Sequence, residues 1–104
     1  MNDAIERLKR SWGSIAESMQ CYAELRYYDP VSTWECYVYA VDPSDEDTCL
    51  CIIKVHKNDH AVLDEWSLNA IRALYNEQGE GVCLDMEYRP MRACELFKRL
   101  NEGL

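Results

Sequence analysis

Two strand-like segments joined by a short acidic turn place the strongest constraint on how this chain folds. Between residues 34 and 41, apolar side chains alternate with an amphipathic set that includes Tyr37 and Tyr39, which is the period-two pattern of a β-strand. Residues 48–55 are almost continuously apolar, as in a central strand of a sheet. The link between them begins with Asp42-Pro43, a turn former. Strands joined by so short a link pair antiparallel, so we predict an antiparallel sheet.

The segment before these strands has the periodicity of an amphipathic helix. Its large apolar residues recur at spacings of three and four, which places them on one stripe. They are Ile5, Leu8, Trp12, Ile15, Met19 and Tyr22. Asn2 or Asp3 can cap the start of this helix, and Gly13 is expected to bend or split it. We expect the apolar stripe to pack on the sheet.

The remaining elements are shorter, and their order defines the fold class. Further strands are expected at residues 21–28 and 82–88, with an optional short strand at 61–63. Helices are expected over residues 68–78, after the capping residue Ser67, and over residues 91–100. The order α-β-β-β-(β)-α-β-α predicts an α+β fold: an N-terminal helix, an antiparallel sheet of four to five strands, and two further helices, with the helices on one face. At 104 residues the chain is expected to form a single domain, residues 1–104.

Hydropathy and cysteine content predict a cytoplasmic protein. No apolar run approaches the roughly 18–20 residues that a membrane span needs. The polar start Met1-Asn2-Asp3 leads to no apolar signal core. Without a secretory signal, we expect the six cysteines to be reduced thiols packed among apolar residues. They are Cys21, Cys36, Cys49, Cys51, Cys83 and Cys94.

Motifs for catalysis and metal binding are scarce. The sequence has no glycine-rich phosphate loop and no nucleophile elbow, and His56 and His60 lie in a polar stretch without helical periodicity. Cys49 and Cys51 share a strand face but lack the second pair of a structural zinc site. Solvation explains the paired carboxylates of the late strand without a reaction. We therefore expect no catalysis, no cofactor and no bound metal.

Negative charge is concentrated in the middle of the chain. Residues 29–87 hold 13 acidic and 3 basic residues, a net charge of −10, whereas the whole chain has a net charge of −8. Such a field repels nucleic acids and membranes and attracts basic surfaces. The acids of interest are Asp42, Asp45, Glu46, Asp47, Asp64, Glu65, Glu77, Glu80, Asp85 and Glu87. Spaced carboxylates can imitate the phosphates of a duplex, or they can serve solubility alone.

All of these acids except Glu77 and Glu80 form the predicted partner-binding face. We predict Tyr37, Tyr39 and Trp66 as exposed anchors beside it, because aromatic side chains dominate binding energy at interfaces. The acids at residues 45–47 are expected to be solvated and to contribute little to stability. Two small basic groups, at residues 7–10 and 89–99, make a modest footprint for nucleic acid beside a net charge of −8.

Short motifs between residues 24 and 100 resemble a family of small proteins of unknown function carried on plasmids, phages and integrative elements. The resemblance rests on Arg26, Asp29-Pro30, Trp34, Asp42-Pro43, Asp45-Glu46-Asp47, Ser67-Leu68, Asp85-Met86-Glu87 and Pro90. It covers about three quarters of the chain and leaves the first helix outside. That family supplies no activity or catalytic residues, but it implies a mobile-element setting. In size and charge the chain is similar to anti-CRISPR and anti-restriction inhibitors.

Two functions follow as expectations. The first is an inhibitor of host defence that binds a basic, nucleic-acid-handling surface of a CRISPR effector or restriction complex as a DNA mimic, without contacting nucleic acid or membranes itself. The second is a non-catalytic adaptor or regulatory module, with a homodimer as one possible form. In that form, the first helix and the outer face of residues 34–41 would supply the interface.

Overall fold

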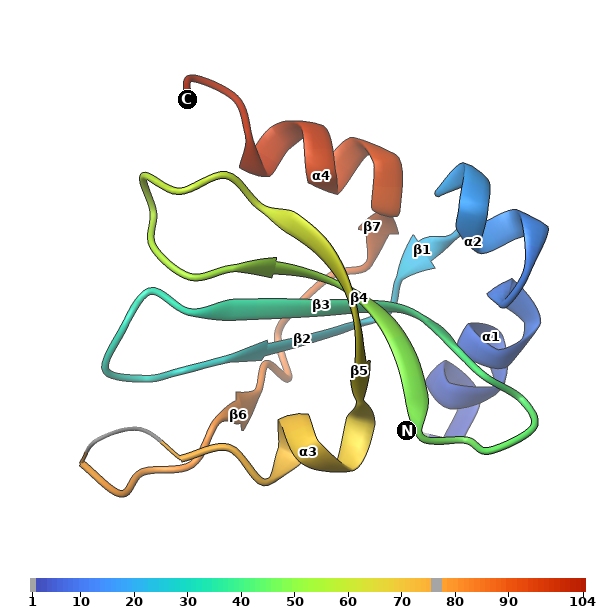
Figure 1. Cartoon of the computed structure of the whole chain (residues 1–104), viewed down its shortest axis with the longest axis horizontal. Coiled ribbons are helices and arrows are strands. Elements are labelled where there is room, and N and C mark those ends of the chain that lie inside the picture. Colours follow the sequence, from blue (N-terminus) through green and yellow to red (C-terminus); the bar gives the residue numbers. More distant parts are fainter. Residues whose placement is uncertain (1, 76–77) are drawn as a thin grey trace.

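The chain begins with short helices, continues with a run of consecutive strands, and ends with helices separated by short strands, which confirms the predicted α+β fold class (Figure 1). The computed structural model describes residues 2–75 and 78–104, so Glu77 and part of the predicted 68–78 helix lie outside the described residues. The helices are α1 (Asn2–Ser11), α2 (Ser14–Ser18), α3 (Leu68–Arg72) and α4 (Ala93–Leu100). The strands are β1 (Tyr22–Ala23), β2 (Leu25–Tyr28), β3 (Glu35–Val41), β4 (Thr48–Lys54), β5 (Val62–Ser67), β6 (Cys83–Leu84) and β7 (Met91–Arg92).

The main sheet has five strands in the order β5-β4-β3-β2-β6, and every neighbouring pair is antiparallel. This confirms the predicted antiparallel sheet and the N-terminal helix. The optional strand at residues 61–63 is in fact a six-residue strand, β5, and it forms one outer edge of the sheet. The short strand β6 forms the other outer edge. Anything placed on β5 is therefore separated from anything on β6 by the width of three strands.

Helices cover both faces of the sheet, so the prediction that they pack on one face is wrong. Alternate residues of β4 belong to two different apolar cores: Cys49 and Cys51 lie in one, and Ile52 lies in the other. Since alternate residues of a strand point to opposite faces, the two cores lie on opposite sides of the sheet. Residues of α1 and α3 complete the first core, and residues of α2 and α4 complete the second.

A β-bulge in β3 changes the predicted division of its side chains between the two faces. The pairing with β4 shifts between Val38 and Ala40, so Tyr39 is the extra residue. Beyond the bulge Ala40 joins the core that holds Tyr39, and Val41 joins the core that holds Val38. Strict alternation would have placed Ala40 and Val41 the other way round.

The N-terminal helix is split at Gly13, as predicted. Gly13 has a φ of 101°, a conformation that side chains rarely adopt, and the chain restarts as the short helix α2. Beyond the break the apolar stripe is only partly buried: Met19 packs against the second core, but other residues are exposed. Leu8 is fully buried, whereas Ile15 is 49% exposed and Tyr22 is 45% exposed, so the prediction that the whole stripe packs on the sheet is wrong for these two residues.

Elements near the C-terminus are shorter than predicted. Ser67 caps α3 by accepting a hydrogen bond from the Ala70 N–H, as expected, but the helix ends at Arg72. The chain then doubles back, because Leu74 accepts a hydrogen bond from the Val82 N–H and Tyr75 bridges to Gly81. The predicted strand at 82–88 is reduced to β6. It ends where Asp85 accepts a hydrogen bond from the N–H of Glu87 in a local turn.

All six cysteines are free, and Cys36, Cys49 and Cys51 lie together in the first core. The neighbouring thiol of Cys51 and burial raise the pKa of Cys49, and the thiol of Cys36 raises the pKa of Cys51. Cys83 and Cys94 are only half-buried. Among the described residues, no helix is long and apolar enough to cross a bilayer.

Candidate functional site

The turn between β3 and β4 holds four of the predicted acids in an ordered backbone. Asp42 accepts hydrogen bonds from the N–H and hydroxyl of Ser44, at 2.8 and 2.7 Å. Asp45 accepts them from the N–H groups of Asp47 and Thr48, both at 2.9 Å, and from the Thr48 hydroxyl at 2.6 Å. These bonds, that from the hydroxyl above all, lower the pKa of Asp45. Short side chains that accept nearby N–H groups are typical of tight turns.

Asp47 joins this turn to the end of β5 and the start of α3. Its carboxylate accepts hydrogen bonds from the Ser67 hydroxyl at 2.6 Å and the Asn69 N–H at 2.9 Å, and its carbonyl accepts one from the Leu68 N–H at 2.7 Å. The bonds from Ser67 and Asn69 lower the pKa of Asp47. Asp45 is exposed, as expected for a solvated turn acid, and Asp47 is half-buried; the hydrogen bonds that both accept hold the turn in place. Glu46 is exposed and pairs with Lys9 at 3.0 Å.

The outer strand β5 continues this acidic surface. Asp64 and Glu65 are exposed in the middle of the strand, and the Asp47–Ser67 contact connects the turn to the same strand. We call this surface the acidic edge; it consists of Asp42, Asp45, Glu46, Asp47, Asp64 and Glu65. Asp85 and Glu87 follow β6, which forms the other edge of the sheet. The eight acids predicted to form one face are therefore divided between two separate edges.

The predicted aromatic anchors are not free side chains. Tyr37 is 5% exposed and Tyr39 is 4% exposed, so the prediction that they are exposed anchors is wrong. The second core covers them, and the Tyr37 ring lies 5.6 Å from that of Tyr88. The face of residues 34–41 proposed for a homodimer is buried for the same reason. Trp66 is half-buried, and its indole N–H donates to the Asp64 carboxylate at 2.7 Å.

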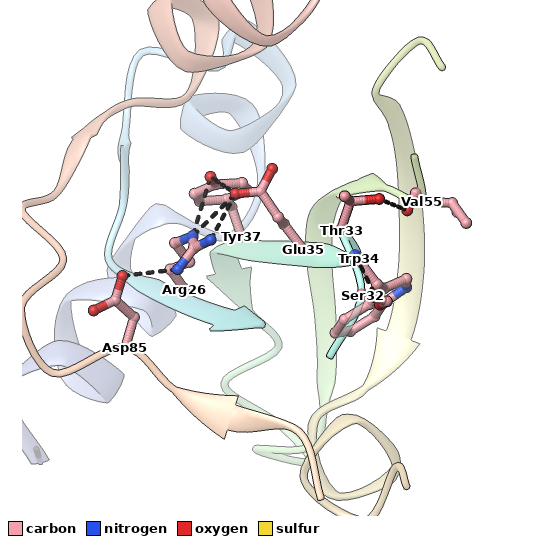
Figure 2. A network of polar contacts seen from close by, with 8 residues as sticks. All are labelled: Arg26, Ser32, Thr33, Trp34, Glu35, Tyr37, Val55 and Asp85. Carbon is pink, nitrogen blue, oxygen red and sulfur yellow. Dashed lines mark hydrogen bonds and ion pairs between the residues drawn. The ribbon is translucent and has the colours of Figure 1, made fainter. Parts of the chain in front are cut away.

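Asp85 belongs to a network centred on Arg26, which Figure 2 shows from close by. The guanidinium donates to Asp85 at 2.8 Å and to one oxygen of Glu35 at 2.8 and 3.1 Å. The Tyr37 hydroxyl donates to the same Glu35 oxygen at 2.7 Å. Burial disfavours the charged form of Arg26, yet the bonds to Glu35 and Tyr37 hold its pKa above the ordinary value. Burial and Glu35 raise the pKa of Tyr37.

An open pocket of about 480 Å³ lies beside this network, between the β2–β3 turn and the end of α4. Four cationic side chains line it: Arg26, Lys54, Lys57 and Arg99. Arg26 is already paired, and the buried Lys54 donates to the Leu100 carbonyl at 2.5 Å. Of these four, the exposed Lys57 and Arg99 remain available to a ligand. Three acids, Asp29, Glu35 and Glu102, line the same pocket. The network is therefore best suited to holding β2, β3 and the segment after β6 together.

Metal binding finds no support in the described part of the chain. No group of three or more histidine, cysteine or acidic residues there could hold an ion. His56 and His60 lie in an exposed turn, as predicted, and Cys49 and Cys51 pack in the core.

Sequence reasoning missed the two features that give this surface its form. It did not predict the role of Arg26, although a charged residue between the apolar Leu25 and Tyr27 of a strand indicates a buried partner. It also treated β5 as optional, because the acids at positions 64 and 65 interrupt the apolar pattern. That interruption is itself typical of an outer strand.

No protein-family model, curated protein sequence or solved structure matches this chain. The resemblance to mobile-element proteins therefore stays a prediction.

Proposed function

We propose that this chain is a non-catalytic, cytoplasmic protein-binding module that inhibits a host-defence complex. Its acidic edge would bind a basic, nucleic-acid-handling surface of a CRISPR effector or restriction complex. One observation supports this above all others: Asp47 of the acidic β3–β4 turn is hydrogen-bonded to Ser67 at the end of β5, the outer strand that carries the exposed Asp64 and Glu65. Arginine and lysine side chains that bind phosphates also bind carboxylates. The defence setting comes from the resemblance and from the net charge of −8.

A rigid edge is better suited to this purpose than a flexible acidic tail. Asp42, Asp45 and Asp47 fix the turn through their own hydrogen bonds, and the Trp66 indole N–H holds the Asp64 carboxylate on β5. Preorganised charges lose little conformational entropy on binding. The pairing of Arg26 with Glu35 and Asp85, beside the cationic pocket, supports a non-catalytic role.

The decisive experiment measures competition with nucleic acid. Purified CRISPR effectors and restriction complexes would be titrated with the protein, and DNA binding followed by fluorescence anisotropy at low and high salt. We expect DNA to be displaced, with an apparent affinity that falls as salt rises, because screening weakens charge pairing. Glu65→Gln should weaken displacement several-fold. The control Glu87→Gln removes an equally exposed acid near the opposite edge and should have no effect.

Equal effects of Glu65→Gln and Glu87→Gln, or displacement that is independent of salt, would count against the acidic edge as the binding surface. Failure to bind any defence complex would leave the second candidate, an adaptor with another protein partner. The exposed apolar residues of β5 favour that candidate, since Val62 is 52% exposed and Leu63 is 47% exposed.

A further inference from the structure

The outer edge of β5 is an unpaired strand edge of the main sheet. The six residues of β5 pair with β4 along their whole length, from Thr48–Ser67 to Ile53–Val62. No other strand in the described part of the chain pairs with β5 on its far side. A strand in that position presents a row of backbone donors and acceptors to which another strand can bind.

The direction of the backbone groups along β5 can be assigned from two contacts. The Cys51 thiol of β4 donates to the carbonyl of Asp64 at 3.5 Å, so the backbone of Asp64 faces β4. The Glu65 N–H donates instead to the side chain of Asp64 at 2.8 Å, so it faces away from β4. Because the direction alternates along an antiparallel strand, Leu63 and Glu65 present their N–H and C=O groups to the open edge.

We propose that the open edge of β5 accepts an extended basic segment of the partner as an additional antiparallel strand. This inference rests on the proposed function and names the form of the partner: two adjacent apolar residues next to two adjacent Lys or Arg residues. Val62 and Leu63 point to opposite faces of the sheet, and so do Asp64 and Glu65, so the partner needs a matching residue on each face. The apolar ones would contact Val62 and Leu63, and the basic ones would pair with Asp64 and Glu65.

The charge of β5 decides between this occupant and a second copy of the chain. Antiparallel pairing of two β5 strands would bring the acids at positions 64 and 65 of both copies side by side. Like charges in such positions destabilise strand pairing, whereas a basic strand gains from the same acids. The bond from the Glu65 N–H to Asp64 further protects the free edge until a partner carbonyl replaces the carboxylate.

The test uses a synthetic ten-residue peptide with the repeat Val-Val-Lys-Lys as the probe. The comparison peptide has the repeat Val-Val-Glu-Glu, which keeps the pattern of apolar residues and reverses the charge. We expect the basic peptide to bind, the acidic peptide not to bind, and the amides of Leu63 and Glu65 to become protected from hydrogen exchange on binding. Protection of these amides without peptide, rising with protein concentration, would show that the occupant is a second copy and would overturn the proposal.

Two variants of Leu63 distinguish the contribution of its backbone N–H to peptide binding from that of its side chain. Leu63→Pro removes a donor that faces the open edge, a position where an outer strand tolerates proline. We expect it to lower peptide affinity about tenfold, since a strand-pairing hydrogen bond is lost, and Leu63→Ala to lower it far less. Thermal melting checks that both variants fold. Should Leu63→Pro fail to fold, the exchange protection of the wild-type amides decides the question.

The double variant Asp64→Asn/Glu65→Gln separates this inference from the proposed function. Strand addition would be refuted if the double variant lost affinity for the basic peptide while Leu63→Pro and Leu63→Ala bound it equally well and no amide became protected. The acidic edge would then remain as a binding surface. If all three variants bound the basic peptide as tightly as the wild type, both strand addition and the acidic edge as a binding surface would be refuted.

Discussion

At the scale of single residues, Asp47 connects three elements that are distant in sequence. It lies in the β3–β4 turn and accepts hydrogen bonds from the last residue of β5 and the first turn of α3. No pattern in the sequence separates Asp47 from its exposed neighbour Glu46, because both are acids in the same polar turn. Only the long-range contact with Ser67 distinguishes them.

The lowered pKa of Asp47 predicts a pH dependence of stability. A carboxylate whose pKa is lower in the folded state stabilises the protein above its unfolded pKa of about 4, and this contribution is lost as the pH falls through the folded value. Asp47→Asn should therefore melt at a lower temperature than the wild type at pH 7, and the difference should close below about pH 4. Thermal melts followed by circular dichroism from pH 7 to 2.5 would measure this. Glu87→Gln, the control, should show no difference at either pH.

The Arg26 network predicts a large cost for removing the cation alone. Arg26→Met leaves the carboxylates of Glu35 and Asp85 without their partner. Since these side chains are 22% and 24% exposed, we expect a loss of about 2–4 kcal/mol, below the value for a fully buried pair. Tyr37→Phe removes only one hydrogen bond to Glu35 and should cost about 1 kcal/mol.

Urea denaturation of both variants gives these free energies of unfolding directly. Lys57→Met, an exposed lysine that lines the neighbouring pocket, is the matched control and should change stability little. An equally small cost for Arg26→Met would mean that the network does not hold β2, β3 and the segment after β6 together.

At the scale of elements, the sequence predicts strands and helices well where one periodicity persists. The sequence predicts β3 and the N-terminal helix from regular apolar periods, and β4 from an almost continuous apolar run. α3 is shorter than predicted because the chain after Arg72 pairs with residues 81 and 82 instead of continuing the helix. The two-residue strands β1, β6 and β7 are too short to have a period.

The candidate surface was predictable only in its composition. The sequence identifies the acids, but their division between β5 and β6 depends on the strand order, which no local pattern encodes. The burial of Tyr37 and Tyr39 depends on α4, which lies more than fifty residues further along the chain and covers the second face of the sheet.

Because the helix is interrupted at Gly13, we expect alanine substitutions at two residues of the same apolar stripe to lower the free energy of unfolding by very different amounts. Leu8 in α1 is fully buried in the first core, so Leu8→Ala should cost about 2–5 kcal/mol. Ile15 in α2 is 49% exposed, so Ile15→Ala should cost well under about 1 kcal/mol. Urea denaturation of the pair measures both values. Similar costs would show that α2 continues the stripe of α1.

At the scale of the whole molecule, we expect the net charge of −8 to keep the open β5 edges of different copies apart. The net charge is −8 near neutral pH and vanishes near the isoelectric point of about 4.6. We therefore expect a monomer at neutral pH and self-association near pH 4.6, measured by light scattering at several concentrations.

Asp64→Asn/Glu65→Gln should begin to associate at a higher pH than the wild type, because it lacks the repulsion along β5 itself. The control Glu87→Gln/Glu95→Gln, at two exposed acids outside β5, has the same net charge and an unchanged β5. Identical onset of association in the two variants would assign the effect to net charge alone and not to the strand edge.

Because the six cysteines are buried to different degrees, their reactivity reports when the first core becomes exposed. Cys83 and Cys94 are half-buried, so an alkylating reagent should modify them first. Cys36, Cys49 and Cys51 lie within the first core, and the raised pKa values of Cys49 and Cys51 further lower their thiolate content. They can react only when the sheet separates from α1 and α3. Timed alkylation followed by mass spectrometry would thus follow the unfolding of the core, without any introduced label and even inside a living cell.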